Sequence, residues 1–288
     1  MASSELSQRP EFVRRPIERP IFDLRLKPWK SNTSLRDQLS TKPFCGEGFL
    51  YHATTEQLRE TLAILTKDWE EAELVKDTAA FAAKVHKDDK RKDEETPYEH
   101  HLLRGAIRLA QLKETNTFMI TGYLLHDTVE DHNTTVQEML LPQNLGQHPS
   151  EQAKTLHDLA TALSVNRGKG KLEPKEFYKN INEINARYPE AHPWLIKGVD
   201  RFDNAGSDLS FAIRHDNPRV GVEKIKKYRK KTSDVIPYIK KAEPNSPVLA
   251  RLQESLRLGG ELMRDHGLKD PKNITIIFNR LSFLRPMS

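Results

Sequence analysis

An aliphatic stretch with helical spacing, residues 122–125, leads directly into the pair His126-Asp127, and Glu130 and Asp131 follow one turn later. In the core of a helical protein, an imidazole and three carboxylates cost several kcal/mol unless something compensates for their burial. A divalent metal ion is the usual compensation, and mixed imidazole and carboxylate ligands suit Mn, Fe or Zn better than Ca. The pair therefore predicts a metal site inside a helical fold.

From Thr55 onward, apolar residues recur at three- and four-residue spacing, which predicts a succession of α-helices. The predicted helices cover residues 56–66, 69–87, 98–113, 116–127, 134–141, 151–164, 174–187, 192–203, 218–241 and 247–265. Only the tail segment 274–278 has the character of a strand. The sequence therefore predicts an all-α bundle, a fold class that gathers ligands from several helices into one core site.

Proline and arginine dominate residues 1–54, which we interpret as an extended N-terminal arm. The helical pattern predicts one domain over 55–265, and residues 266–288 form a C-terminal tail. The single cysteine, Cys45, rules out an internal disulfide and is typical of a reducing compartment.

Composition excludes some classes of protein. The chain has 288 residues and no apolar run near the roughly 20 residues that a membrane span needs, so we expect no membrane segment and a cytoplasmic location. The formal net charge is +5, with basic clusters in the arm and over 224–231, but no nucleic-acid-binding motif accompanies them. A solvated helix face or an anionic small-molecule substrate explains this charge as well as nucleic acid does.

Further metal ligands should lie on other helices of the bundle. His101 stands at the start of a predicted helix, and Asp200 follows the apolar stretch 194–199, so both join His126 and Asp127 as candidates. Each residue alone has an ordinary interpretation: a helix-start histidine, a core histidine near a helix end, or a surface aspartate paired with a neighbouring cation. Together they form a set of two histidines and two carboxylates.

Three blocks of sequence carry a more specific signal. They are Arg91-Lys92 with Pro97-Tyr98-x-x-His101, then Leu124-Leu-His-Asp-Thr-Val-Glu-Asp131, then Lys197-x-x-Asp-Arg-x-x-Asn204. In order and approximate spacing, these blocks resemble the hydrolase domain of the RelA/SpoT family, a branch of the HD-domain metal phosphohydrolases. The resemblance covers roughly residues 70–240. It implies an HD-domain helical bundle that removes the 3′-pyrophosphate from the alarmones ppGpp and pppGpp, and a stand-alone small alarmone hydrolase.

The resemblance also implies a role for each matching residue. The ligands of one Mn²⁺ ion would be His101, His126, Asp127 and Asp200. Glu130 and Asp131 match the acidic pair that orients or deprotonates the attacking water. Arg91, Lys92 and Asn204 match positions that contact the nucleotide substrate. These roles agree with the general chemistry of metal-activated water and of Arg and Lys with phosphate.

Departures from the family pattern lie around the nucleotide pocket. The usual His-x-Gly-Gln is His86-Lys-Asp-Asp89, the Ser-Gly-Glu before Pro-Tyr is replaced over 93–96, and Ala205-Gly-Ser follows Asn204. They leave the substrate open: NADPH (as a 2′-phosphatase), ppApp or pyrophosphorylated tRNA, as in an antitoxin-like enzyme, are alternatives to (p)ppGpp. A non-catalytic nucleotide-binding protein is the alternative from another class, and the oligomeric state stays open.

Overall fold

The structure is a computed structural model that describes residues 50, 53–91, 96–113, 115–165, 170–214 and 218–264. Most of the predicted arm, the predicted tail 266–288 with its segment 274–278, and Lys92 lie outside the described residues. The predicted domain boundaries therefore stay predictions.

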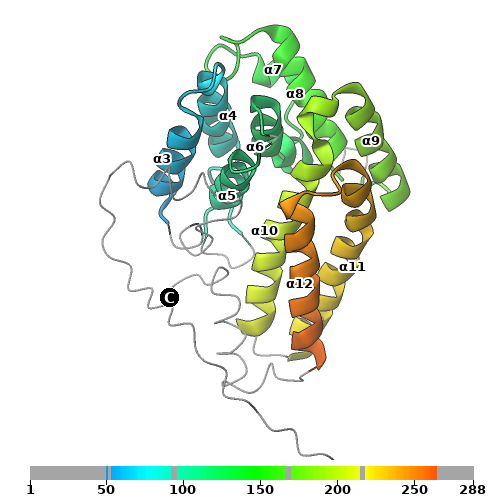
Figure 1. The fold of residues 1–288 in the computed structure, drawn as a ribbon. Helices are drawn as coiled ribbons and strands as arrows, with labels where there is room; N and C mark the ends of the chain where they lie inside the picture. The colour runs from blue at the N-terminus through cyan, green and yellow to red at the C-terminus, as the bar shows by residue number, and fades with distance from the viewer. Residues whose placement is uncertain are drawn as a thin grey trace, which may run out of the picture. The chain divides into compact units, whose positions relative to one another are not determined.

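Helices account for almost all of the regular structure, which confirms the predicted all-α bundle (Figure 1). Apart from helices, the described residues contain one isolated antiparallel β-bridge, between Lys90 and Pro97. In chain order the helices are α3 (Thr55–Thr66), α4 (Ala72–Val85), α5 (Glu99–Ala110), α6 (Thr117–His132), α7 (Val136–Met139), α8 (Ser150–Leu163), α9 (Pro174–Arg187), the 3₁₀ turn η1 (Pro189–Ala191), α10 (Pro193–Arg214), α11 (Pro218–Ala242) and α12 (Pro247–Arg264).

Two helices continue beyond their predicted ends. The prediction that a helix stops at residue 127 is wrong, because α6 continues to His132 and stops where Asn133 adopts a left-handed conformation with φ of 52°. The amide of Asn133 satisfies carbonyl groups in the last turn of α6, as a left-handed cap does. The prediction that a helix stops at residue 203 is also wrong: α10 continues to Arg214. The longer helices keep Glu130, Asp131 and Asn204 on regular helical faces.

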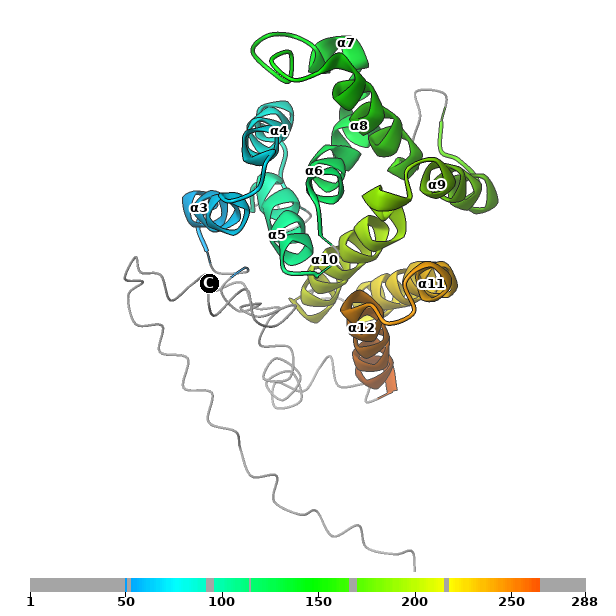
Figure 2. The same cartoon turned by 45° about the horizontal axis from the view of Figure 1, so that its top comes forward.

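Helix α6 is the central element of the bundle. It begins at Asn116, whose side chain accepts a hydrogen bond from the amide of Met119, and it is buried almost throughout from Thr117 to Val129. It packs against α4, α5, α8 and α10, which surround it in Figure 2. A helix enclosed on all sides lacks a solvent-facing stripe, and so polar residues on it face the protein interior.

A glycine lets α5 approach α6 closely. A Cβ atom on Gly105 would lie 1.8 Å from the ring of Tyr123, so only glycine fits there. This contact brings the start of α5, with His101, beside the middle of α6, with His126. The hydroxyl of Tyr123 then donates to the carbonyl oxygen of His101 (3.3 Å) and joins the two helices.

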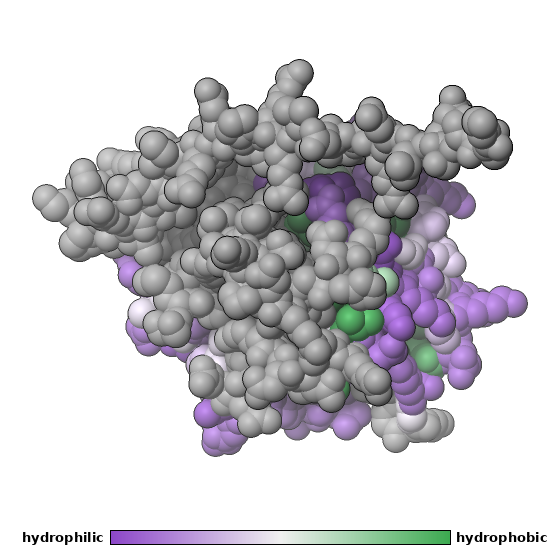
Figure 3. Space-filling model, turned by 90° about the horizontal axis from the view of Figure 1, so that it is seen from below, coloured by the Kyte–Doolittle hydropathy of each residue, from purple (hydrophilic) through white to green (hydrophobic). Residues whose placement is uncertain are grey.

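The surface of the described residues is polar. Leu141 and Val220 are the exposed large hydrophobic side chains among the residues that the structure describes. The described atoms visible in Figure 3 are mostly hydrophilic, with isolated hydrophobic spots. In the described part of the chain, no helix has the length and apolar character needed to cross a membrane.

Candidate metal centre and active site

The four predicted ligands lie together in the core. They come from three helices: His101 from α5, His126 and Asp127 from α6, and Asp200 from α10. His101 Nε2 lies 3.3 Å from Asp127 Oδ2 and 3.7 Å from Asp200 Oδ1. His126 Nε2 lies 3.0 Å from Asp127 Oδ1 and 3.8 Å from Asp200 Oδ1. All four residues are buried, and so their donor atoms converge on one small interior volume.

The hydrogen bonds on the far sides of the two imidazoles fix their tautomers. His126 Nδ1 lies 2.6 Å from the carbonyl oxygen of Tyr123, which can only accept, so Nδ1 carries the proton. His101 Nδ1 lies 2.8 Å from Asp203 Oδ2, again an acceptor. Both Nε2 atoms are therefore bare when the rings are neutral, and both are buried without a hydrogen-bond partner. Two lone pairs facing carboxylate oxygens form a donor set that fits a divalent cation.

Electrostatics at the cluster favour an added positive charge. Burial alone would lower the pKa of His126, but the carboxylates of Asp127 and Asp200 raise it to about 10. Burial alone would raise the pKa of Asp127, but His126 and His101 hold it well below its usual range. The anionic groups therefore stay ionised, and the site attracts either a proton or a metal ion.

Asp200 has cationic neighbours of its own on α10. Lys197 Nζ lies 2.8 Å from Asp200 Oδ2, and Arg201 Nη2 lies 3.5 Å from the same oxygen. Burial alone would raise the pKa of Asp200, but these two cations bring it well below its usual value. The ordinary interpretation of Asp200, an ion pair with its neighbours, thus coexists with its place in the ligand cluster.

Asp203 is a functional residue that the sequence interpretation did not single out. Its side chain is fully buried and accepts from His101 Nδ1, while Arg104 donates to both its oxygens (2.9 Å each) and Arg108 to Oδ1 (2.6 Å). Burial alone would raise its pKa, but the two guanidinium groups hold it well below the usual range. A signal was available, because Arg104 and Arg108 stand one turn apart in an otherwise apolar helix and require a buried anion.

The segment between α4 and α5, described at 86–91 and 96–98, places Arg91 and Tyr98 beside the cluster. The amide of Arg91 donates to Thr96 O (2.8 Å) and the amide of Tyr98 to Asp89 O (3.0 Å), which closes the turn. The hydroxyl of Tyr98 donates to Asp127 Oδ2 (2.7 Å), and the Arg91 guanidinium lies 5.3 Å from the Tyr98 ring centre. Burial, followed by the charge of Asp127, raises the pKa of Tyr98, so this hydroxyl remains a donor.

Asn204 links the predicted substrate residue to a predicted ligand. Its Oδ1 accepts from Arg91 Nη2 (2.9 Å), and its Nδ2 donates to Asp200 Oδ1. Ser207, one turn later on α10, also accepts from Arg91 Nη2 (3.2 Å). The structure therefore brings together Arg91 and Asn204, two of the predicted substrate residues, whereas the third, Lys92, lies outside the described residues.

The acidic pair at the end of α6 divides into two environments. Glu130 Oε2 accepts a hydrogen bond from the amide of Val165 (3.0 Å) and so holds the second residue after α8. Asp131 is an exposed residue, and partial desolvation of its carboxyl, with the like charges of Asp127 and Glu130, raises its pKa to about 6. A carboxylate with such a pKa is suited to accept a proton near neutral pH.

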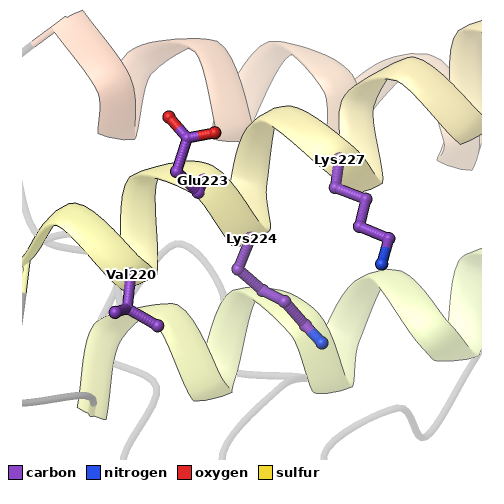
Figure 4. Close-up of a pocket in the computed structure, with 4 residues that line it drawn as sticks. All are labelled: Val220, Glu223, Lys224 and Lys227. Carbon is purple, nitrogen blue, oxygen red and sulfur yellow. The ribbon is translucent and has the colours of Figure 1, made fainter.

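A surface hollow on α11 contains none of the predicted site residues. Val220, Glu223, Lys224 and Lys227 line it, and in Figure 4 Glu223 points to the opposite side of the helix from the two lysines. Lys224 forms an ion pair with Asp208 of α10 (3.2 Å). The hollow is open and charged, which agrees with a solvated helix face.

Buried histidines and aspartates at the meeting point of α5, α6 and α10 define a helical protein with a candidate metal site. Comparison with curated proteins shows which family within that class the chain is similar to. The human guanosine-3′,5′-bis(diphosphate) 3′-pyrophosphohydrolase MESH1 is 40% identical over 137 residues, which are 46% of this chain and 69% of that protein. MESH1 of Xenopus tropicalis is 38% identical over 106 residues, 36% of this chain and 58% of the frog protein.

A bacterial relative matches at lower identity. The guanosine-3′,5′-bis(diphosphate) 3′-pyrophosphohydrolase of Aquifex aeolicus is 32% identical over 133 residues, 46% of this chain but 17% of that protein. No family model matches the chain, and no solved structure matches it significantly. The chain belongs to the family of guanosine-3′,5′-bis(diphosphate) 3′-pyrophosphohydrolases of the HD type, as the resemblance predicted. It spans only part of these relatives, 58% of the frog protein, so their activity does not transfer directly.

Proposed function

We propose that the chain is a metal-dependent 3′-pyrophosphohydrolase that acts on guanosine 3′-diphosphates of the (p)ppGpp class. The observation that carries the proposal is the convergence of the buried Nε2 atoms of His101 and His126 with the carboxylates of Asp127 and Asp200. In the reaction, water adds to the phosphorus bonded to O3′ and the P–O3′ bond breaks. The oxygen of water ends on pyrophosphate, O3′ takes up a proton, and GDP or GTP is the other product.

His101, His126, Asp127 and Asp200 would hold the metal ion. We propose Mn²⁺, which is among the ions that mixed imidazole and carboxylate donors suit and is the ion that the family resemblance implies. When bound, the ion supplies a hydroxide nucleophile near neutral pH, since it lowers the pKa of water. Two further residues of the chain position these ligands. Asp203 orients His101 through Nδ1, and the Tyr98 hydroxyl holds Asp127 in place.

Proton transfer and substrate binding fall to residues around this cluster. We assign to Asp131 the role of the base that accepts a proton from water, and to Glu130 the fixing of the neighbouring backbone. Arg91 presents a fork of donors to phosphate oxygens, with Asn204 and Ser207 fixing its orientation. Lys92 would add a second positive charge. The cytoplasmic location belongs to the same proposal, because the lone Cys45 fits a reducing compartment.

A substrate panel tests the proposal. Purified full-length chain is stripped with a chelator and resupplied with Mn²⁺, Zn²⁺ or Mg²⁺, and then offered ppGpp, pppGpp, ppApp, NADPH and pyrophosphorylated tRNA. Released pyrophosphate and phosphate are measured separately. We expect pyrophosphate from ppGpp and pppGpp, most with Mn²⁺. Phosphate from NADPH alone, or tight ppGpp binding without turnover in saturating metal, would contradict it.

Asp131→Asn should remove the acid limb of the pH–rate profile. In the wild type, the rate should fall as pH drops below about 6, because Asp131 becomes protonated and can no longer accept a proton. In the variant, kcat should fall by about 10²–10⁴-fold at pH 8, and the remaining rate should lose this limb. Stopped assays between pH 5 and 9 measure both effects.

Thermal stability provides the control for Asp131→Asn. A raised carboxyl pKa means that folding disfavours the ionised form, so the contribution of Asp131 to stability falls as the pH rises from 3.8 to about 6 and stays unfavourable above that. The uncharged variant should therefore melt at the same temperature as the wild type or higher at pH 8. A lower melting temperature together with an unchanged acid limb would remove Asp131 from the base role.

Arg91→Lys should weaken substrate binding more than it changes the chemistry. A lysine keeps the positive charge but cannot reach Asn204, Ser207 and a phosphate in one plane, as a guanidinium can. We expect kcat/KM for ppGpp to fall by about 10–100-fold, mostly through KM, because one charge-assisted contact is worth about 1.5–3 kcal/mol. Steady-state kinetics with ppGpp at saturating metal measure kcat and KM separately. An unchanged KM would contradict the role of Arg91 in substrate binding.

A further inference from the structure

A second cluster of possible ligands lies outside the four-residue cluster described above. His86 Nδ1 is 2.8 Å from Asp89 Oδ2, and His132 Nε2 is 2.6 Å from the same oxygen. The three ligand atoms all lie within 4.8 Å of one another. One carboxylate oxygen facing two imidazole nitrogens is the arrangement that a site with two histidines and one carboxylate would have before a metal ion enters.

We propose that His86, Asp89 and His132 bind a second divalent transition-metal ion, of the class that takes imidazole and carboxylate ligands. A tetrahedral site of this kind uses three protein ligands and leaves the fourth position to water. Asp89 is half-buried and the His132 side chain is about one-third exposed, at 34%, so the open position faces solvent. The proposal does not depend on the reaction proposed above.

The backbone holds the three ligands where they are. His86 directly follows α4, and Asp89 is held by its amide, which donates to His86 O (3.0 Å), and by its carbonyl, which accepts from Tyr98 N (3.0 Å). His132 is the last residue of α6, fixed by the left-handed cap at Asn133. Two segments thus supply the three ligands, the turn after α4 two and the end of α6 one, and their fixed backbone is the preorganisation that a metal site requires.

His86 is the buried anchor of this cluster. Its ring stacks on Tyr98 with centres 4.6 Å apart and meets His132 edge to face at 4.7 Å. Coordination through Nδ1 moves the ring proton to Nε2, which has no hydrogen-bond partner among the described residues and so loses none.

Tyr98 separates the second cluster from the first. One face of its ring covers His86, while its hydroxyl donates to Asp127. None of the three proposed ligands appears among the contacts of the first cluster, and Asp127 and Asp89 have different histidine partners. The separate ligand sets predict that each ion is lost with its own carboxylate, while the charge of Asp127 also acts on His86.

Counting metal equivalents tests the proposal. Full-length protein is stripped with a chelator, loaded with Zn²⁺ or Co²⁺, desalted and measured by elemental analysis, with Co²⁺ absorption as a second readout. We expect two equivalents in the wild type, one each in Asp89→Ala and His132→Ala, and one in Asp127→Ala with the absorption of the second site retained. His148→Ala is the matched control and should keep two metal equivalents. His148 forms an ion pair with Asp77 (2.9 Å) outside both clusters.

Two outcomes would overturn the second site. One is a single equivalent in the wild type that disappears in Asp127→Ala, and the other is two equivalents retained in both Asp89→Ala and His132→Ala. Circular-dichroism melting of each variant shows whether it is folded. His132 is exposed, so its loss should leave the fold intact and the metal count interpretable.

Discussion

Asp127→Ala should reduce turnover by about 10³-fold or more while leaving the protein folded. Asp127 Oδ1 and Oδ2 face His126 and His101 at 3.0 and 3.3 Å, so its loss opens the proposed metal site on the α6 side. A metal ion contributes several kcal/mol of transition-state stabilisation, and each ~1.4 kcal/mol is a factor of ten in rate. Initial rates with ppGpp measure the loss of turnover, and the metal that stays bound after desalting measures the loss of the site.

Asp127 is a cleaner target than Asp200 for this test. Loss of Asp200 would leave the buried ammonium of Lys197 without its carboxylate at 2.8 Å, and an uncompensated buried charge destabilises strongly. Loss of Asp127 removes a carboxylate that accepts from the Tyr98 hydroxyl and faces two imidazoles, and an imidazole can become neutral by releasing its proton. A variant with wild-type rate or with an undiminished metal count at this cluster would show that the ligand assignment is wrong.

The helices were predictable because their signals are local. Apolar spacing depends on neighbours three and four residues away, and the Asn116 cap and Pro174 lie within one turn of the helices they begin. The ends of α6 and α10 were predicted too early, since polar residues there look like the start of a loop. In the structure Thr128 and Val129 of α6 and Asp203 and Ala205 of α10 are buried, so tertiary packing overrides the local pattern.

The site was predictable in part for a different reason. Three motif blocks in order identified His101, His126, Asp127 and Asp200, and the structure brings these residues together, although their role as ligands stays a prediction. Asp203 is separated from Arg104 and Arg108 by about 100 residues in the sequence. A local sequence pattern therefore cannot predict which arginine contacts which carboxylate. The double role of Asn204, between Arg91 and Asp200, likewise depends on the packing of α10.

Asp203→Ala should cost about 3–5 kcal/mol of unfolding free energy, which is the usual result of removing one partner from a buried ion pair. Asp203 and Arg108 have fully buried side chains and that of Arg104 is 4% exposed, so solvent cannot replace the lost carboxylate. For a domain of this size, 1 kcal/mol corresponds to roughly 2–4 °C in Tm. We therefore expect Tm to fall by about 6–20 °C, measured by circular dichroism, with denaturant unfolding giving the free energy.

A matched variant separates stability from the orientation of His101. Asp203→Asn removes the charge but keeps an oxygen that can accept from His101 Nδ1, whereas alanine removes both. If the asparagine variant is destabilised but keeps more of its metal affinity than the alanine variant, the carbonyl oxygen suffices to hold the tautomer with a bare Nε2. If both variants melt like the wild type, the two arginines do not depend on Asp203, and its buried charge does not organise the site. If both melt lower and bind metal as tightly as the wild type, Asp203 stabilises the fold without positioning His101.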